Sequence, residues 1–109
     1  MKKMIVFILT LSAAGALSVR AADAKETFNN LCAKCHGEDG KGQTKMGRKL
    51  AIKDFTDPKV QALGTDDEFF KIVNEGLKNN EGRLRMKAVE GFANNEIKAL
   101  VQYVRSFKK

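Results

Sequence analysis

The chain has 109 residues, of which 43% are hydrophobic and 30% are charged, with 2 Cys, 1 His and no Trp. This length allows one domain at most, and two cysteines are too few for a disulfide-stapled scaffold. The composition excludes a disordered chain and a membrane bundle. Lys and Arg number 20 against 13 Asp and Glu, but part of this excess lies at the N-terminus.

The first 21 residues have the pattern of a secretory signal peptide. A basic pair at positions 2–3 precedes an apolar run at 4–17, and small-residue cleavage patterns end at Ala21 and Ala24. The run is shorter than the roughly 20 residues of a membrane span. We expect cleavage after Ala21, or alternatively after Ala24, and export to the periplasm.

Residues 22–109 then form the single domain. Without Lys2, Lys3 and Arg20 the chain keeps 17 basic against 13 acidic side chains, a net charge of +4. This charge is too small for a nucleic-acid footprint. We expect a monomer that binds no nucleic acid and has no stable membrane insertion, and whose small core needs a cofactor or metal to complete it.

Three main helices are predicted. The first follows a capping-box spacing of Asp23 and Glu26 and breaks at the glycine-rich segment 37–42. The second starts at a capping box beginning at Thr65 and stops at Gly76. Asn94 is the predicted N-cap of the last helix. Each helix has one apolar face. On the first helix it is formed by Ala24, Phe28, Leu31 and Cys35, and on the second by Phe69, Ile72, Val73 and Leu77. On the last helix it is formed by Ile97, Leu100, Val101, Val104 and Phe107.

The segments between these helices lack a regular period. We expect one short helix from Pro58 to Gly64 and a long loop over residues 78–93, and no stretch alternates as a strand does. The fold class is therefore all-α, with three main helices and one or two short ones.

The sequence Cys32-Ala33-Lys34-Cys35-His36 is the attachment pattern of haem c. Thiols three positions apart on a helical turn can form thioethers with the two vinyl groups of one haem, and the adjacent imidazole can bind its iron. Since the chain has only 2 Cys and 1 His, this arrangement is specific. We expect one covalently attached haem c.

Other uses of these residues are less favoured. A thioredoxin-type disulfide shares the C-x-x-C spacing but belongs near a βαβ pattern that the sequence lacks. A zinc site needs four ligands, and two Cys with one His leave it one short. A structural disulfide would not need the histidine.

With this motif, the chain resembles a small bacterial class I cytochrome c with one haem, over essentially the whole domain. Phe28 and Ala24 match the aromatic and small residues that precede the first cysteine in that family, although the small residue there is usually Gly. Leu100 and Tyr103 match its last helix, and residues 35–42 resemble the loop of the bacterial members. The resemblance implies a cytochrome c-like fold, wrapped around the haem, in which the first and last helices cross.

The resemblance also implies Met86 as the second iron ligand opposite His36. The ligand in that family lies seventeen residues before the aromatic of the last helix, as Met86 does before Tyr103. The other candidate, Met46, lies in a basic stretch. A thioether opposite His stabilises ferrous iron and raises the reduction potential. Lys87 follows Met86 where the family usually has Pro, which weakens the stiffness of the ligand loop.

The loop after His36 lacks the Pro that many relatives use to position a carbonyl for the imidazole. Another carbonyl must then accept the proton on the second ring nitrogen.

A haem also needs an apolar envelope, and charged side chains flank the two ligand segments. The envelope candidates are Leu31, Leu50, Ile52, Phe55, Phe69 or Phe70, Leu77, Leu84, Phe92, Ile97 and Leu100. The flanking basic residues are Lys34, Lys45, Arg48, Lys49, Arg83, Arg85 and Lys87, which could steer an acidic redox partner. Mid-chain acidic residues, namely Asp54, Asp57, Asp66, Asp67 and Glu68, would make the surface dipolar.

These features predict a periplasmic electron carrier, not an enzyme, that cycles its haem between Fe(II) and Fe(III) with His36 and Met86 as axial ligands. Its redox partner proteins are not identified by the sequence. The alternative is a haem-based ligand-binding or sensor protein with an open or weakly ligated sixth position. The lack of a second His argues against peroxidase chemistry.

We predict that the exported protein begins at Ala22, with Lys25 as the second choice, and is recovered in the soluble periplasmic fraction. Intact-mass measurement of the secreted form tests this. A mass that still includes the first 21 residues, or recovery only with membranes, would overturn it.

Overall fold

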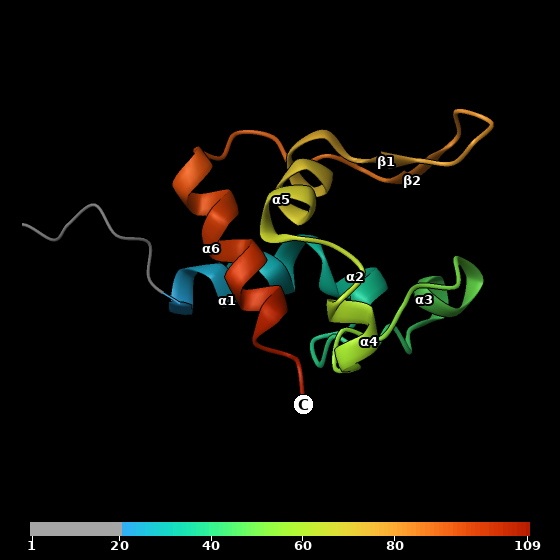
Figure 1. The fold of residues 1–109 in the computed structure, drawn as a ribbon, viewed down its shortest axis with the longest axis horizontal. Coiled ribbons are helices and arrows are strands. Elements are labelled where there is room, and N and C mark those ends of the chain that lie inside the picture. The colour runs from blue at the N-terminus through green and yellow to red at the C-terminus, as the bar shows by residue number, and fades with distance from the viewer. Residues whose placement is uncertain (1–20) are drawn as a thin grey trace, which may run out of the picture.

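The computed structural model describes residues 21–109, and Figure 1 shows the course of the chain. The helices are α1 (Ala21–Leu31), α2 (Ala33–His36), α3 (Lys45–Lys49), α4 (Pro58–Gln61), α5 (Asp66–Glu75) and α6 (Asn94–Arg105), and the strands are β1 (Leu77–Lys78) and β2 (Leu84–Met86). The expected signal peptide lies outside the described residues apart from Ala21, and its cleavage stays a prediction.

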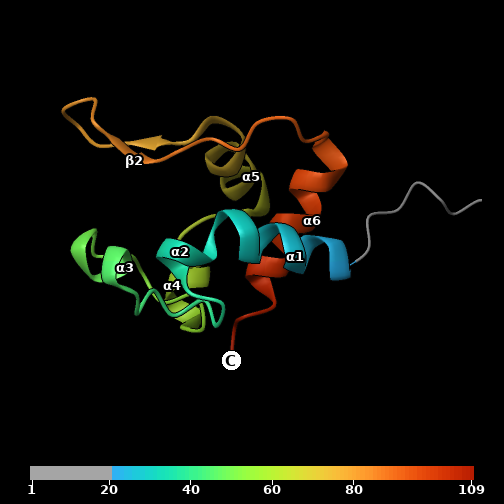
Figure 2. The same cartoon turned by 180° about the vertical axis from the view of Figure 1, so that it is seen from behind.

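The three main helices of the prediction are α1, α5 and α6, and α1 and α5 each pack against α6 (Figures 1 and 2). The buried apolar residues are Ala24, Phe28, Ile97, Leu100 and Val101, each at most 3% exposed. They lie at helical spacing on α1 and α6, so each helix turns one apolar stripe toward the other. The crossing of the first and last helices is therefore the core of the described chain.

Local capping signals set the ends of α5 and the start of α4. The Thr65 hydroxyl accepts from the Glu68 N–H at 3.1 Å, and the Glu68 carboxylate accepts from the Thr65 N–H at 2.8 Å, which confirms the predicted capping box. Gly76, at φ 80°, ends α5. Pro58 opens α4 behind an Asp57 cap.

Two other predicted boundaries are wrong. Helix α1 begins at Ala21, so Asp23 lies in its first turn, where a carboxylate favours the helix dipole without capping it. Helix α4 ends at Gln61 rather than at Gly64.

The start of α6 differs by one residue from the prediction. Ala93 is the N-cap, its N–H donates to the Glu96 carboxylate at 2.8 Å, and Asn94 is the first helical residue. The predicted first helix is divided into α1 and α2, and the short helices besides these between residues 21 and 109 are α3 and α4. Within the same residues no helix is long and apolar enough to cross a membrane.

The prediction that the chain has no strand is also wrong. Strands β1 and β2 form an antiparallel hairpin in which Leu77 lies opposite Met86 and Lys78 opposite Leu84, with an irregularity between the two pairs. The strands have two and three residues and are mostly exposed. They are too short and too exposed to show alternating hydrophobicity in the sequence.

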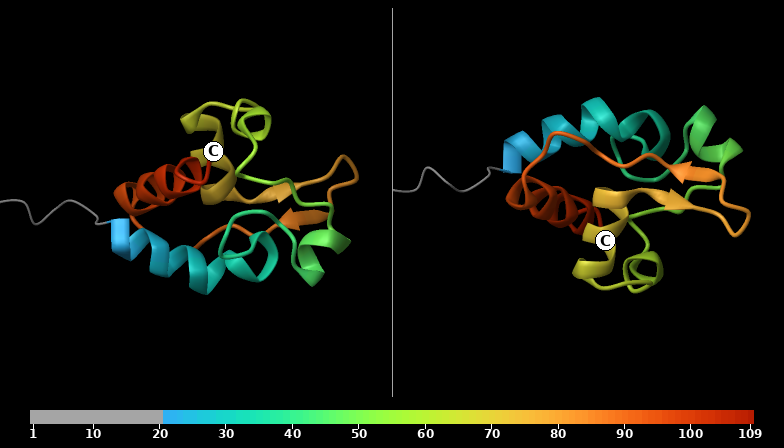
Figure 3. Two further views of the ribbon diagram at one scale, coloured as in Figure 1. Left: turned by 90° about the horizontal axis from the view of Figure 1, so that it is seen from below. Right: turned by 90° about the horizontal axis from the view of Figure 1, so that it is seen from above.

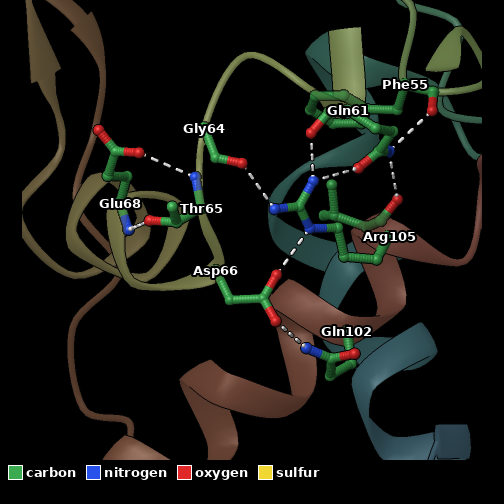
Figure 4. A network of polar contacts seen from close by, with 9 residues as sticks. Phe55, Gln61, Gly64, Thr65, Asp66, Glu68, Gln102 and Arg105 are labelled. Carbon is green, nitrogen blue, oxygen red and sulfur yellow. Dashed lines mark hydrogen bonds and ion pairs between the residues drawn. The ribbon is translucent and has the colours of Figure 1, made fainter. Parts of the chain in front are cut away.

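Arg105, the last residue of α6, joins this helix to α4 and α5 (Figure 4). Its guanidinium donates to the Asp66 carboxylate at 2.7 Å, to the Gly64 carbonyl at 2.8 Å and to both oxygens of Gln61. It also lies over the Phe69 ring, 4.2 Å from the centroid. The hydrogen bonds that Asp66 accepts from Arg105 and, secondarily, from Gln102 hold the pKa of its carboxyl below its ordinary value.

Gln61 is a buried polar side chain, 5% exposed, at the centre of this network. Its amide nitrogen donates to the carbonyls of Phe55 at 2.8 Å and Val104 at 2.9 Å (Figure 4). Because both polar atoms of the amide are paired, its burial carries little desolvation cost.

We predict that Arg105→Met lowers the free energy of unfolding by about 2 kcal/mol or more, because it leaves Gln61 and the Gly64 carbonyl without their charged donor. Urea unfolding of the holoprotein measures this. The control is Arg83→Met, since Arg83 and Glu81 are 3.9 Å apart and mostly exposed, and its effect should stay within about 0.5 kcal/mol. Equal effects of the two changes would contradict the assignment of Arg105.

Candidate functional site

Cys32, Cys35 and His36 lie on one helical turn that continues α1. The N–H of Cys32 donates to the Phe28 carbonyl at 2.8 Å, and the N–H groups of Cys35 and His36 donate to the Cys32 carbonyl at 3.2 and 2.9 Å. Both thiols are half-buried and are not joined in a disulfide. The two thiols and the imidazole of the attachment pattern therefore lie close together in the structure.

The environment of Cys32 does not favour thioredoxin-type chemistry. Burial, and secondarily the neighbouring Cys35, raise the pKa of the Cys32 thiol to about 11. A redox-active cysteine of that type needs a lowered pKa, because the thiolate is the nucleophile. Across residues 21–109 no group of three or more His, Cys, Asp or Glu side chains gathers to hold a metal ion.

The imidazole of His36 lies between two phenylalanine rings. Phe55 stacks on it with centroids 4.8 Å apart and an interplanar angle of 18°, and Phe28 lies tilted at 6.4 Å. The ring centroid of Phe28 also lies 5.3 Å from that of Tyr103 and 5.2 Å from that of Phe107. We call these five rings the aromatic cluster.

The Nδ1 atom of His36 is buried and has no hydrogen-bond partner in the described chain. The carbonyl that was expected to accept from this nitrogen is not found among the described residues. Burial also lowers the pKa of the imidazole, which keeps it in the neutral form that binds a metal.

The segment after His36 folds back onto the cysteine-containing turn. The N–H of Gly42 donates to the His36 carbonyl at 2.7 Å, and the Thr44 hydroxyl donates to the Cys35 carbonyl at 2.6 Å. A Cβ at Gly47 would lie 2.1 Å from the Gly42 oxygen and 2.6 Å from the Cys35 oxygen. Only glycine allows α3 to pack this closely.

The sequence pattern predicts no helix in this region, where the structure has α3. The signal that could have found it is Thr44, an N-cap whose hydroxyl also accepts from the Gly47 N–H at 2.8 Å. The stacking of Phe55 on His36 was missed as well, because nothing in the local sequence relates two residues so far apart.

Met86 ends β2, is half-buried, and lies against the end of α5. A Cβ at Gly76 would lie 2.7 Å from the Met86 oxygen and 2.9 Å from the Ala88 nitrogen, so glycine permits the close approach. The Val89 N–H donates to the Val73 carbonyl at 3.0 Å. The segment around Met86 is therefore fixed by its backbone to α5.

The two candidate methionines lie in different layers. The β1–β2 hairpin extends over the α2–α3 segment, on the same side of the helical body (Figures 1 and 3). Met86 belongs to the hairpin, whereas Met46 belongs to α3, beside the turn that carries His36. The Arg85 guanidinium crosses between the layers and donates to the Leu50 carbonyl at 2.6 Å.

The envelope candidates fall into three groups. Ile97 and Leu100 are buried between α1 and α6. Leu50, Ile52, Phe55, Phe69, Phe70 and Phe92 are half-buried. Leu31, Leu77 and Leu84 are 54%, 44% and 60% exposed, and they lie at the end of α1 and on the two strands of the hairpin.

All seven basic residues that flank the two ligand segments are exposed. They lie on α2, on α3 and on the β2 side of the hairpin. Several mid-chain acidic residues have structural partners, since Asp57 caps α4, Glu68 completes a capping box and Asp66 pairs with Arg105.

The sequence profile of the family described as cytochrome c oxidase, cbb3-type, subunit III matches residues 19–104. The chain belongs to this family. Two similar curated proteins are cbb3-type cytochrome c oxidase subunits CcoP of Helicobacter pylori. The one from strain 52 is 32% identical over 85 residues, and the other is 31% identical over 85 residues. These matches cover 77% of this cytochrome but 27% of each relative, so the chain spans about a quarter of their length.

Two solved structures are similar to this cytochrome. The KustC0563 c-type cytochrome has a TM-score of 0.66 at 34% identity, covering 79% of this chain and 98% of that one. A mutant of the same KustC0563 protein has a TM-score of 0.64 at 36% identity, with coverage of 79% and 99%. The fold is thus cytochrome c-like, and the family and these neighbours imply a covalently attached haem c.

The residues of the candidate site fit this group. The turn presents two free thiols at the required spacing and an adjacent, neutral imidazole. The exposed leucines Leu31, Leu77 and Leu84 offer apolar surface that the protein alone does not cover. A haem between the hairpin and the α2–α3 segment would bury such surface.

We predict that Gly47→Ala reduces the yield of holoprotein several-fold and destabilises it by about 1–3 kcal/mol, because the added methyl group forces α3 away from the cysteine turn. Haem absorbance per mole of protein and urea unfolding measure the two effects. Lys49→Ala, an exposed change on the same helix, should leave both unchanged. A normal yield for Gly47→Ala would show that this packing is not needed.

Proposed function

We propose that this cytochrome is a periplasmic electron carrier whose haem c is attached through Cys32 and Cys35 and ligated by His36 and Met86. The observation that carries the proposal is the single helical turn in which two free thiols and one imidazole lie together. The protein has no catalytic residue in this account, and no substrate is transformed.

Bound haem c supplies a one-electron step between Fe(II) and Fe(III). The residues of the chain attach it, orient it and limit the access of water. Cys32 and Cys35 hold its edge through thioethers, and His36 supplies an imidazole that burial keeps neutral. The Met86 sulfur, a soft donor on the hairpin side, favours the ferrous state and raises the potential.

The proposed partners are proteins that dock through an acidic surface near the exposed haem edge. The seven exposed basic residues on α2, α3 and the hairpin support this, because like-signed charge around an electron-transfer edge steers oppositely charged partners. The curated relatives are oxidase subunits, so we propose a terminal oxidase complex as one electron acceptor. The docking complex would be small and short-lived.

A haem-based ligand-binding protein is the second candidate function. Lys87 replaces the Pro that stiffens the ligand loop in class I cytochromes, and the hairpin strand that holds Met86 has only three residues. A weak iron–sulfur bond would let an external ligand compete for the sixth position.

We predict that Met86→Ala abolishes the methionine-to-iron charge-transfer band and lowers the reduction potential, because the soft donor to ferrous iron is lost. The covalent haem content should stay normal, since both thioethers remain. Visible spectroscopy and redox titration of the holoprotein measure these effects.

Met46→Ala is the matched control and should leave the band and the potential nearly unchanged. Loss of the band in Met46→Ala alone would reverse the ligand assignment. The ligand-binding function would be favoured instead by two observations together. The wild-type protein would lack the methionine-to-iron band, and carbon monoxide would bind its ferrous haem at full occupancy.

A further inference from the structure

Phe55 has no assigned role, yet it is the ring in closest contact with the candidate iron ligand. It lies in the loop between α3 and α4, with its ring stacked on the His36 imidazole at 4.8 Å and 18°. A nearly parallel stack at this distance restricts rotation of the imidazole about its bond to Cβ. The opposite neighbour, Phe28, is tilted by 41° at 6.4 Å and leaves more freedom.

The backbone of Phe55 is fixed at both of its polar atoms. Its N–H donates to the Gly40 carbonyl at 2.8 Å, within the loop that follows His36. Its carbonyl accepts from the buried Gln61 amide at 2.8 Å. Gln61 is in turn bonded to α6 through the Val104 carbonyl and the Arg105 guanidinium (Figure 4). The ring is thus placed by α4, by α6 and by the loop after α2.

Hydrogen bonding does not provide this orientation. Metal-binding histidines ordinarily donate from the second ring nitrogen to a carbonyl or carboxylate, which fixes the ring plane. Nδ1 of His36 is buried without such a partner among the described residues, and the loop has no Pro to position a carbonyl. Of the two rings against this imidazole, Phe55 is the closer and more nearly parallel, and its stack is the contact that best defines the plane of the ring.

We propose that Phe55 is the positioning residue of the axial histidine, and that its ring, held by Gln61, sets the plane in which the His36 imidazole meets the haem iron. This rests on the proposed role of His36 as a ligand. The stack replaces a hydrogen bond as the orienting contact. An imidazole without an acceptor at Nδ1 is also a weaker donor to iron, which adds to the effect of a thioether ligand on the potential.

The test compares ferric holoprotein variants by electron paramagnetic resonance, because the plane of an axial imidazole governs the splitting of the low-spin iron signals. Phe55→Leu removes the stacked ring but keeps an apolar side chain. It should shift and broaden the largest g value and change the reduction potential, while the covalent haem content stays normal. Phe55→Tyr keeps the ring and should restore the wild-type signal.

Val60→Ala is the matched control. It removes apolar volume from a half-buried side chain of α4, directly before Gln61, and Val60 is not one of the rings around His36. It should lower stability but leave the g values unchanged. Gln61→Met, which releases the Phe55 carbonyl without touching the ring, should broaden the signal as Phe55→Leu does and provides a second test if that variant folds poorly.

Unchanged g values in Phe55→Leu, or equal shifts in Phe55→Leu and Val60→Ala, would overturn the inference while the function stands. Failure of the proposed function looks different, because the wild-type protein would then show no low-spin ferric haem with a bound histidine.

Discussion

The packing of Phe28 between α1 and α6 is the contact on which both the fold and the haem site depend. Its side chain is 1% exposed and lies against the rings of Tyr103 and Phe107. Its carbonyl accepts the N–H of Cys32, which starts the turn that bears the thiols and the imidazole. Burial of one phenylalanine stabilises the chain by about 1.5–3 kcal/mol, and here the same residue joins the helix crossing to the site.

The two sides of the candidate site are built differently. Around His36 the helices α2, α3, α4 and α6 are connected by the aromatic cluster, the Gly47 contact and the Arg105 network with Gln61. Around Met86 a short hairpin leaves two leucines exposed and is joined to the other layer by Arg85. A small domain with so few buried side chains gains much from a large apolar cofactor. We infer that the haem completes the hairpin side and is oriented by the histidine side.

The motif, the capping box at Thr65 and the apolar stripes of α1 and α6 could be predicted from sequence because each depends on residues close together in the chain. The hairpin could not, since its short, exposed strands carry no alternation. The Phe55 stack and the hydrogen bonds of Gln61 and Arg105 join residues that only the tertiary fold brings together. Spacing identified Cys32, Cys35 and His36 as neighbours, whereas the ligand role of Met86 stays a prediction.

Mass spectrometry of the tryptic peptides tests the central claim most directly. Trypsin cuts after Lys34, between the two cysteines, and would separate residues 26–34 from residues 35–41. The account predicts that these two peptides stay joined by a single haem through two thioethers and resist separation by a thiol reductant. Two free peptides, or a pair without haem mass that the reductant separates, would contradict attachment of the haem at Cys32 and Cys35.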